Sequence, residues 1–174
     1  MGSSTPVDRL YDESVSVIHT LGISEPSLAV AAGDSFRKAL ILAAASYFEH
    51  RVSSCVLEFV DERANGSGLV VAFVKNKAVS RQYHTWFKWD DTNANQFFGL
   101  FGSDFKQKMV DRIKESEELK RSVRAFLEVG NERNKLVHQD FASFSLEKTL
   151  EEIYELYSLA LLFVEGLSTF LREC

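Results

Sequence analysis

The sequence predicts an all-α protein, an up-down bundle of four to five helices. Three observations favour this fold class: apolar residues recur at helical spacing over long stretches, only 2 of the 174 residues are proline, and no segment offers a partner for a β-strand. Because 45% of the residues are hydrophobic, the chain can build one substantial core. We therefore expect a single helical domain over residues 1–174, with residues 1–6 as a disordered leader.

The first half of the chain reads as two helices. Residues 7–21 place apolar side chains on one side at helical spacing, and Gly22 is a plausible stop. A longer helix is expected from Ser27 to about Arg63. Its stretch ALILAAA at residues 39–45 is apolar on every side, as in a central helix with several neighbours.

The middle of the chain is harder to interpret. Residues 69–74 form a short apolar run that periodicity alone assigns to neither a helix nor a strand, and we favour a helix because an isolated strand leaves its backbone unpaired. Asn93 and Gln96 suit the start of a short helix that Gly102 ends. A dense aromatic group could stack bases, but more often such a group fills a core; its members are Trp86, Phe87, Trp89, Phe97, Phe98 and Phe101.

Two more long helices are expected in the second half. Ser103 can cap a helix that runs to Val129, where Gly130 can break or bend it, and Ser145 can cap the last helix. The last helix carries an apolar seam that could pack within the monomer or partly against a second subunit. The seam consists of Leu146, Leu150, Ile153, Tyr157, Ala160, Val164, Leu167 and Leu171.

Charge and cysteine content narrow the function classes. The net charge of −5 argues against a broad nucleic-acid surface, yet residues 105–138 hold nine Lys or Arg against six Asp or Glu. A solvated helix face would give the same local excess. Cys55 and Cys174 form no disulfide framework and no metal-ligand spacing. With no signal peptide and no apolar run of membrane-spanning length, the expected location is the cytoplasm, without a membrane, metal or cofactor.

The stretch GNERNKLVHQDF at residues 130–141 brings together groups that phosphodiester chemistry uses. Arg133 supplies a permanent cation, Asn134 a small amide, and His138 a side chain that titrates near neutral pH. On a regular helix Arg133 and His138 point about 140° apart, whereas Asn134 and His138 share a face. Singly, each residue has an ordinary explanation. Arg133 could pair with Glu132 or Glu128, His138 could cap a helix end, and Asn134 could be solvated.

This motif resembles the signature of the HEPN superfamily, an Arg followed by a polar residue and then by a His four to six positions after the Arg, between long helices. Arg133, Asn134 and His138 match the signature position by position. Residues 87–89, residues 93–102 and the chain from Phe126 onward resemble the RiboL-PSP type of HEPN domain. The likeness covers most of residues 27–172.

The resemblance implies a metal-independent endoribonuclease that acts on RNA as a homodimer, in which two copies of the motif line one cleft. His138 would exchange a proton with the ribose 2′-hydroxyl or the leaving oxygen, and Arg133 would hold the scissile phosphate. Asn134 would orient His138 or contact the phosphate. Lys135, expected on the surface, is the candidate for a further RNA contact.

The resemblance also implies a biological setting, a prokaryotic toxin or defence effector with a regulatory or antitoxin partner. HEPN toxins paired with a nucleotidyltransferase antitoxin often carry a Tyr two positions after the His, where this chain has Asp140. Silencing by modification of that Tyr is therefore in doubt here. A second interpretation stays open: a non-catalytic HEPN dimer that serves as a binding or assembly module.

Overall fold

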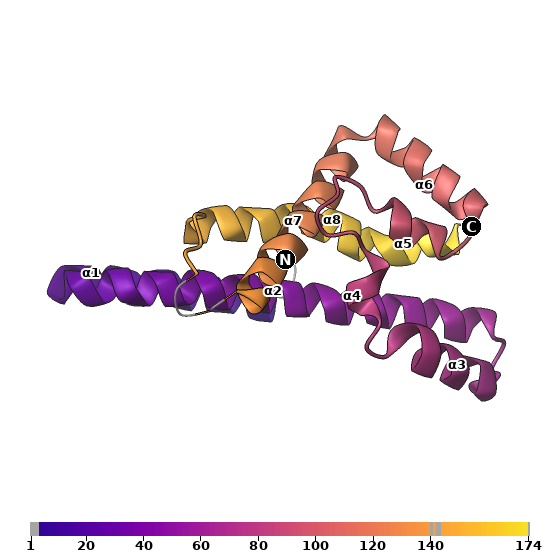
Figure 1. Ribbon diagram of the computed structural model, residues 1–174, viewed down its shortest axis with the longest axis horizontal. Coiled ribbons are helices and arrows are strands. Elements are labelled where there is room, and N and C mark those ends of the chain that lie inside the picture. Colours follow the sequence, from indigo (N-terminus) through magenta and orange to yellow (C-terminus); the bar gives the residue numbers. More distant parts are fainter. Residues whose placement is uncertain (1–3, 140, 142–143, 174) are drawn as a thin grey trace. The chain divides into compact units, whose positions relative to one another are not determined.

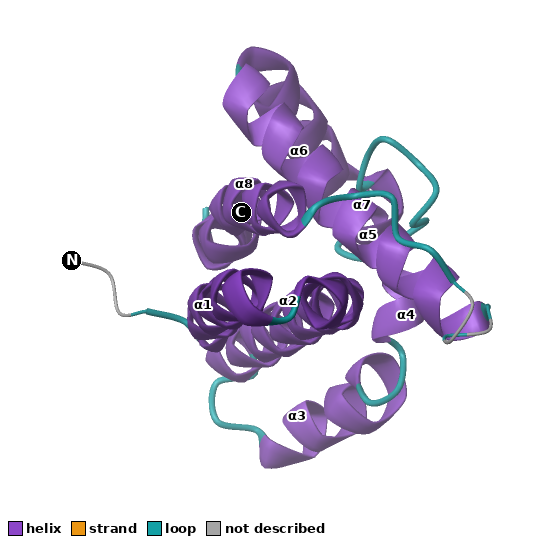
Figure 2. Cartoon of the chain, turned by 90° about the vertical axis from the view of Figure 1, so that its left-hand side faces the viewer, coloured by secondary structure: helices purple, strands orange, loops and turns teal. Residues whose placement is uncertain are grey.

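The computed structural model describes residues 4–139, 141 and 144–173, and every regular element in these residues is helical (Figures 1 and 2). This confirms the all-α prediction. Five helices have 13 residues or more, in agreement with a bundle of four to five. In chain order the elements are α1 (Pro6–Ser24), α2 (Pro26–Arg63), α3 (Gly68–Val74), the π-helix η1 (Lys75–Val79), α4 (Tyr83–Trp86), α5 (Asn95–Gly99), α6 (Ser103–Glu115), α7 (Glu117–His138) and α8 (Leu150–Arg172).

By its internal contacts the chain divides into two compact units. The first unit comprises Met1–Tyr47 and Val129–Ser158, and the second comprises Phe48–Glu128 and Leu159–Cys174. All three boundaries between the units fall inside long helices, since α2, α7 and α8 each begin in one unit and end in the other. The single domain expected from chain length stays a prediction, and each unit is described by itself.

In the first unit, α1 is fixed at its start by side chains. Thr5 and Asp8 form a reciprocal capping box, and the Thr5 hydroxyl lies 2.8 Å from the Tyr157 hydroxyl of α8. Tyr154 donates a hydrogen bond to Asp8 over 3.1 Å. The disordered leader predicted for residues 1–6 is therefore wrong at Thr5 and Pro6, because Thr5 caps α1 and Pro6 is its first residue. Residues 1–3 lie outside the described residues. A capping box supplies the partners that a free terminus lacks.

The turn between α1 and α2 is shorter than the sequence suggests. Helix α1 does not stop at Gly22 but continues to Ser24, and Glu25 alone separates it from α2. A single helical glycine is tolerated at a cost of about 1 kcal/mol, so Gly22 does not have to end the helix. Pro26 stands at the first position of α2, where its missing N–H costs nothing. In Figures 1 and 2, α1 and the first part of α2 lie side by side.

The second unit has an aromatic core. Phe87 stacks on Phe97 with ring centroids 4.7 Å apart, and Phe126 contacts Phe87 at 4.9 Å and Phe163 at 5.2 Å. The core interpretation of the aromatic group is confirmed for its four buried members, Trp86, Phe87, Phe97 and Phe98. Trp89 and Phe101 are half-buried at its edge. Ring pairs of this kind stabilise a core beyond their area alone.

One long helix was predicted from Ser103 to Val129, but two helices occupy this part of the chain. The break lies at Ser116, whose hydroxyl accepts a hydrogen bond from the Leu119 N–H over 3.1 Å and so caps α7. Gly130, expected to break the helix, is buried inside α7. A serine that offers its side chain to the backbone competes with the helical hydrogen bond, which explains why the break falls there.

Two other expectations concern helix starts. Residues 69–74 are helical, as favoured, and form α3. Helix α8 begins at Leu150 rather than just after Ser145, because Thr149 and Glu152 form a capping box, with Thr149 N–H to Glu152 at 2.7 Å and Glu152 N–H to the Thr149 hydroxyl at 3.2 Å. All eight residues of the predicted apolar seam are buried within the single chain.

Helix α8 is long and apolar enough to cross a membrane by length and composition, which corrects the expectation that no such run exists. The same test is passed by core helices of soluble proteins. Here one side of α8 is apolar and buried. The other side is exposed and carries Glu151, Glu152, Glu155 and Glu165. That one-sided pattern is typical of a helix packed against protein.

Candidate functional site

The motif occupies the last two turns of α7, in the first unit. The helix stays regular to its end, with the Gln139 N–H bonded to the Lys135 carbonyl over 3.1 Å. Leu136, fully buried, anchors this part of the helix. Because the helix is regular, Arg133 and His138 keep the angle of about 140° expected from their spacing. One copy of the motif therefore presents its cation and its imidazole in different directions.

Arg133 and Asn134 contact each other. The Arg133 Nη1 donates a hydrogen bond to the Asn134 Oδ1 over 3.1 Å, and both side chains are half-buried. No ion pair is recorded for Arg133 with any residue that the structure describes. The guanidinium is thus hydrogen-bonded to a neutral amide, which does not neutralise its positive charge. Arg133 can therefore still bind an anion.

Glu132 does not form an ion pair with Arg133. It pairs instead with Lys135, with 2.8 Å between Oε1 and Nζ. Lys135 is exposed, as predicted, whereas the Glu132 side chain retains 14% of its accessible surface. An RNA phosphate that binds Lys135 would therefore compete with Glu132 for the ammonium. An ion pair of an exposed lysine contributes little free energy.

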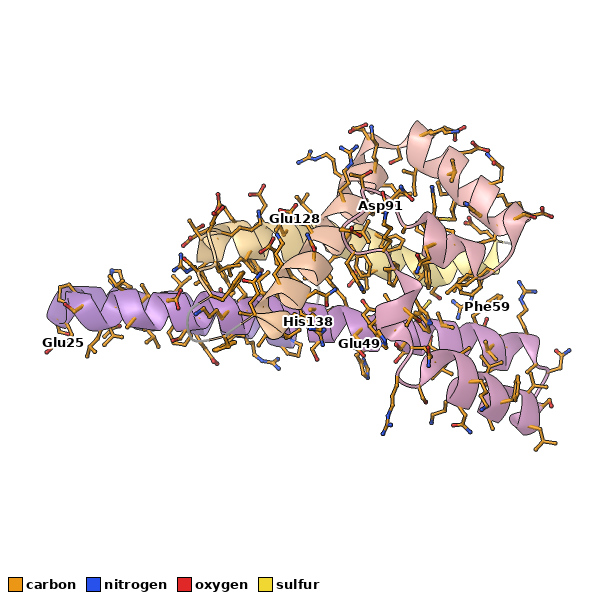
Figure 3. All side chains as sticks on the ribbon, in the orientation of Figure 1. Glu25, Glu49, Phe59, Asp91, Glu128 and His138 are labelled. Atoms are coloured by element: carbon orange, nitrogen blue, oxygen red, sulfur yellow. The ribbon has the colours of Figure 1, made fainter. Side chains whose placement is uncertain are left out.

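His138 is the last residue of α7, where Figure 3 labels it. Its side chain is exposed. Within residues 4–139, 141 and 144–173, the imidazole has no recorded hydrogen bond or ion pair. A free, exposed imidazole can accept or donate a proton to a molecule that binds outside the chain.

Sequence analysis missed a buried cation in the same unit. Lys38 of α2 is buried, pairs with Asp34 at 2.9 Å, and donates a hydrogen bond to the backbone carbonyl of Phe141 at 3.0 Å. Its ammonium also lies 5.3 Å from the centroid of the Phe141 ring. Lys38 thus ties α2 to the chain just after the motif. The spacing of Asp34 and Lys38, four apart on a helix, was the available signal.

The ion pair is reflected in the acid strength of Asp34. The hydrogen bond from Lys38 is the main cause that lowers the pKa of this carboxyl, and desolvation opposes it. Arg37 adds a second contact to Asp34 at 3.2 Å. Asp140, which stands where the resemblance would place the Tyr of some HEPN toxins, lies outside the described residues.

The described residues offer neither a metal-binding cluster nor a reactive thiol. Among the residues described, no three His, Cys, Asp or Glu side chains gather as they would around a metal ion. Cys55 is buried and unpaired, and its burial raises the pKa of the thiol to about 11. Such a thiol is protonated at neutral pH and therefore a poor nucleophile.

A cationic pocket lies in the second unit. It has a volume of about 310 Å³ and is lined by Thr92, Asn93, Asn95, Val110, Ile113, Lys114, Lys120, Val123 and Arg124. Lys114 and Lys120 pair with Asp111 and Glu117 of their own helices. Arg124 is exposed and has no recorded ion pair in the described part of the chain. Cations beside amide donors suit the phosphates of a polynucleotide.

Comparison with known families decides the classification. The family RiboL-PSP-HEPN matches residues 11–173, nearly the whole chain and all of the motif. The chain belongs to this HEPN family. The match begins earlier than the resemblance read from the sequence, which started at residue 27. No curated protein and no solved structure matches the chain significantly.

Membership in the HEPN family carries a coarse functional meaning. HEPN domains are often ribonucleases, others bind nucleotides, and they commonly dimerise and bind RNA. The HEPN assignment thus favours nuclease chemistry for this chain, while the roles of Arg133, Asn134 and His138 stay predictions.

Proposed function

We propose that the protein is a metal-independent endoribonuclease whose site is formed by Arg133, Asn134 and His138. The observation that carries the proposal is the state of the motif on α7. The Arg133 guanidinium is held by the neutral Asn134 amide, and the exposed His138 imidazole has no partner among the described residues. A structural Arg or His would more commonly be paired with a carboxylate or a carbonyl.

The chemistry follows from these groups. In the first step the ribose 2′-oxygen attacks the adjacent phosphorus, a base removes the hydroxyl proton, and the P–O5′ bond breaks. The leaving 5′-oxygen takes a proton, so the products are a 2′,3′-cyclic phosphate and a 5′-hydroxyl. His138 serves as a proton donor or acceptor, and Arg133 stabilises the charge that grows on the phosphate oxygens.

The angle between Arg133 and His138 bears on assembly. Because the helix directs the two side chains about 140° apart, a single copy does not place both on one phosphate. We propose that the enzyme acts as a two-fold homodimer in which Arg133 of one subunit works with His138 of the other. A two-fold contact duplicates every group and so yields two such composite sites.

RNA also needs contacts away from the cleaved bond. Lys135 beside the motif is suited to a phosphate next to the cleaved bond. Each such contact strengthens binding and makes it depend on salt concentration.

The biological setting is also a proposal. On the strength of its HEPN family, we infer that the enzyme is a cytoplasmic prokaryotic toxin or defence effector. A nuclease that cuts cellular RNA would need to be held in check, so a regulatory or antitoxin partner is expected. The family match supports this setting without naming the RNA or the partner.

The direct test is cleavage of RNA without divalent metal. Purified protein would be incubated with a 5′-labelled RNA and with total RNA in EDTA, and the new ends would be identified. We expect 2′,3′-cyclic phosphate and 5′-hydroxyl ends. Cleavage that requires added metal, or that leaves 5′-phosphate ends, would contradict the mechanism. Binding of RNA without cleavage would instead favour a non-catalytic binding or assembly module.

A further inference from the structure

A second pocket in the second unit has a different character from the cationic one. Its volume is about 440 Å³, within the range of roughly 300–1,000 Å³ usual for small-molecule sites. It is built from the C-terminal part of α2, the segment α3 to α4, and α5. The residues that line it are Val56, Phe59, Val60, Val74, Lys77, Ala78, Gln82, Thr85, Trp86, Phe97, Leu100 and Phe101.

The wall of this apolar pocket is largely aromatic. Phe101 contacts Phe59 at 6.0 Å and Phe97 at 5.3 Å, and Trp86 contacts Phe97 at 5.8 Å. The Trp86 indole N–H already donates to the Ala78 carbonyl over 3.0 Å, so its ring offers only apolar surface to the pocket. Figure 3 labels Phe59 on α2. These rings suit a flat or chain-like apolar body.

The polar groups at the pocket are mainly donors. Lys77 is exposed and has no recorded partner among the described residues, and no acidic side chain lines the pocket there. Thr85 gives its hydroxyl proton to the Gln82 carbonyl at 2.7 Å. The Gln82 side-chain N–H groups have no recorded acceptor in the described chain. One ammonium and one amide are therefore available to an anionic group.

The backbone beside the pocket is unusual. Lys77 and Ala78 belong to the π-helix η1, where the Ser80 N–H bonds to the Lys75 carbonyl over 2.8 Å. Just after it, Arg81 has a φ of 62°, in the left-handed region that costs a non-glycine residue free energy. π-Helical turns are rare and occur often at functional sites. Both features turn the chain so that Lys77 and Gln82 line the same pocket.

We propose that this pocket binds a small organic anion with an apolar body, such as an aryl or alkyl carboxylate. The apolar body fills the space between Phe59, Trp86 and Phe101. The anionic group lies at the rim, against the Lys77 ammonium and the Gln82 amide. This site goes beyond the proposed RNA cleavage, shares no residue with the motif, and is tested without RNA.

The first test uses 8-anilinonaphthalene-1-sulfonate, an aromatic anion whose fluorescence rises in apolar surroundings, together with a matched pair of charge variants. Lys75 and Lys77 both lie on η1 and are exposed, but only Lys77 lines the pocket. We expect Lys77→Glu to weaken binding by at least about fivefold, since it replaces a charge-assisted contact by repulsion. Lys75→Glu should bind the dye as the parent does.

Dye binding elsewhere is distinguished by filling the pocket. Val60→Trp would place a large ring in the space, whereas Val70→Trp adds the same ring on the exposed surface of α3 outside the lining. We expect loss of binding only for Val60→Trp, and displacement of the dye from the parent by decanoate. Thermal unfolding would verify that each variant is folded. Since both lysines are exposed, the lysine pair decides the question even where Val60→Trp fails to fold.

Equal affinity of the parent, Lys75→Glu and Lys77→Glu would overturn the proposal. So would a loss of binding in Val70→Trp as large as that in Val60→Trp, because the dye would then bind the exposed apolar residues of α3. The outcome is independent of whether the protein cleaves RNA, so the two proposals can fail separately.

Discussion

Arg133 donates a hydrogen bond from Nη1 to the Oδ1 of its neighbour Asn134, 3.1 Å away, near the end of α7. The amide positions the guanidinium and leaves its charge intact, whereas a carboxylate would neutralise it. A planar guanidinium held in this way can grip two phosphate oxygens at once.

Arg133→Lys should therefore lower the rate of RNA cleavage by about 10²–10³-fold, because an ammonium does not reproduce the planar fork that contacts the phosphate in the transition state. Single-turnover cleavage of a labelled RNA measures the effect. Arg121→Lys is the matched control, since Arg121 is exposed on the same helix outside the motif. Equal losses in both variants would mean that Arg133 acts only as one surface charge among others.

Two substitutions of Asn134 test whether its neutrality matters. Asn134→Ala removes one hydrogen bond to Arg133, and a loss of about 5–10-fold in the cleavage rate is expected. Asn134→Asp keeps the geometry but pairs Arg133 with a carboxylate, so its activity should fall below that of Asn134→Ala. Cleavage rates for both variants that equal the parent's would show that Asn134 is merely solvated.

Lys38 is expected to stabilise the chain that follows the motif. Lys38→Met removes the donor to the Phe141 carbonyl and the partner of Asp34, and should lower the free energy of unfolding by about 1–2 kcal/mol. Chemical denaturation measures this, and amide exchange around Phe141 should quicken. Lys106→Met, at an exposed position of α6, is the control and should change stability little. An unchanged stability of Lys38→Met would remove the anchoring role.

The same ion pair has a defined pH dependence. Because the pKa of Asp34 is lowered in the folded state, its contribution is present above the unfolded carboxyl value of about 3.9 and is lost as pH falls through the lower folded value. Stability measured between pH 7 and 3 should thus fall less steeply in Lys38→Met than in the parent at the acid end. Parallel curves would contradict this.

The fold and the site were predictable from the sequence to different extents. Long, periodic helices can be predicted because one buried face repeats every turn, and so the seven seam residues from Leu150 to Leu171 all lie in α8 and are buried, while Leu146 is buried before the helix begins. Helix boundaries were not predictable in this way. Ser116 breaks the chain through a side-chain hydrogen bond, while Gly130, the more obvious breaker, is carried inside α7 by surrounding burial.

The spacing and residue types of the sequence predict the motif, but they do not predict which side chains contact its members. The contact of Arg133 with Asn134 and the pairing of Glu132 with Lys135 depend on rotamers that no pattern of residues specifies. The anchor at Lys38 depends on a contact over more than 100 positions in the sequence. The apolar pocket depends on the π-helix, which has no simple sequence signature.

Assembly can be tested by mixing inactive subunits. Neither Arg133→Ala nor His138→Ala should cleave RNA alone. If Arg133 of one subunit works with His138 of the other, randomly mixed dimers should recover about a quarter of the parent's activity, since half of the dimers carry one intact site of two. No recovery in verified heterodimers would contradict this pairing. A protein that stays monomeric by light scattering and cleaves at the parent's rate would contradict the dimer altogether.

The most direct measurement of the central claim is cleavage of one defined RNA in EDTA by the parent and by His138→Ala. The proposed role of His138 in proton transfer predicts a loss of about 10²–10⁴-fold in rate. Because the side chain is exposed and has no recorded partner among the described residues, the melting temperature and the helicity of the variant should match the parent's. Comparable cleavage by the two proteins would contradict the assignment of α7 as the catalytic element.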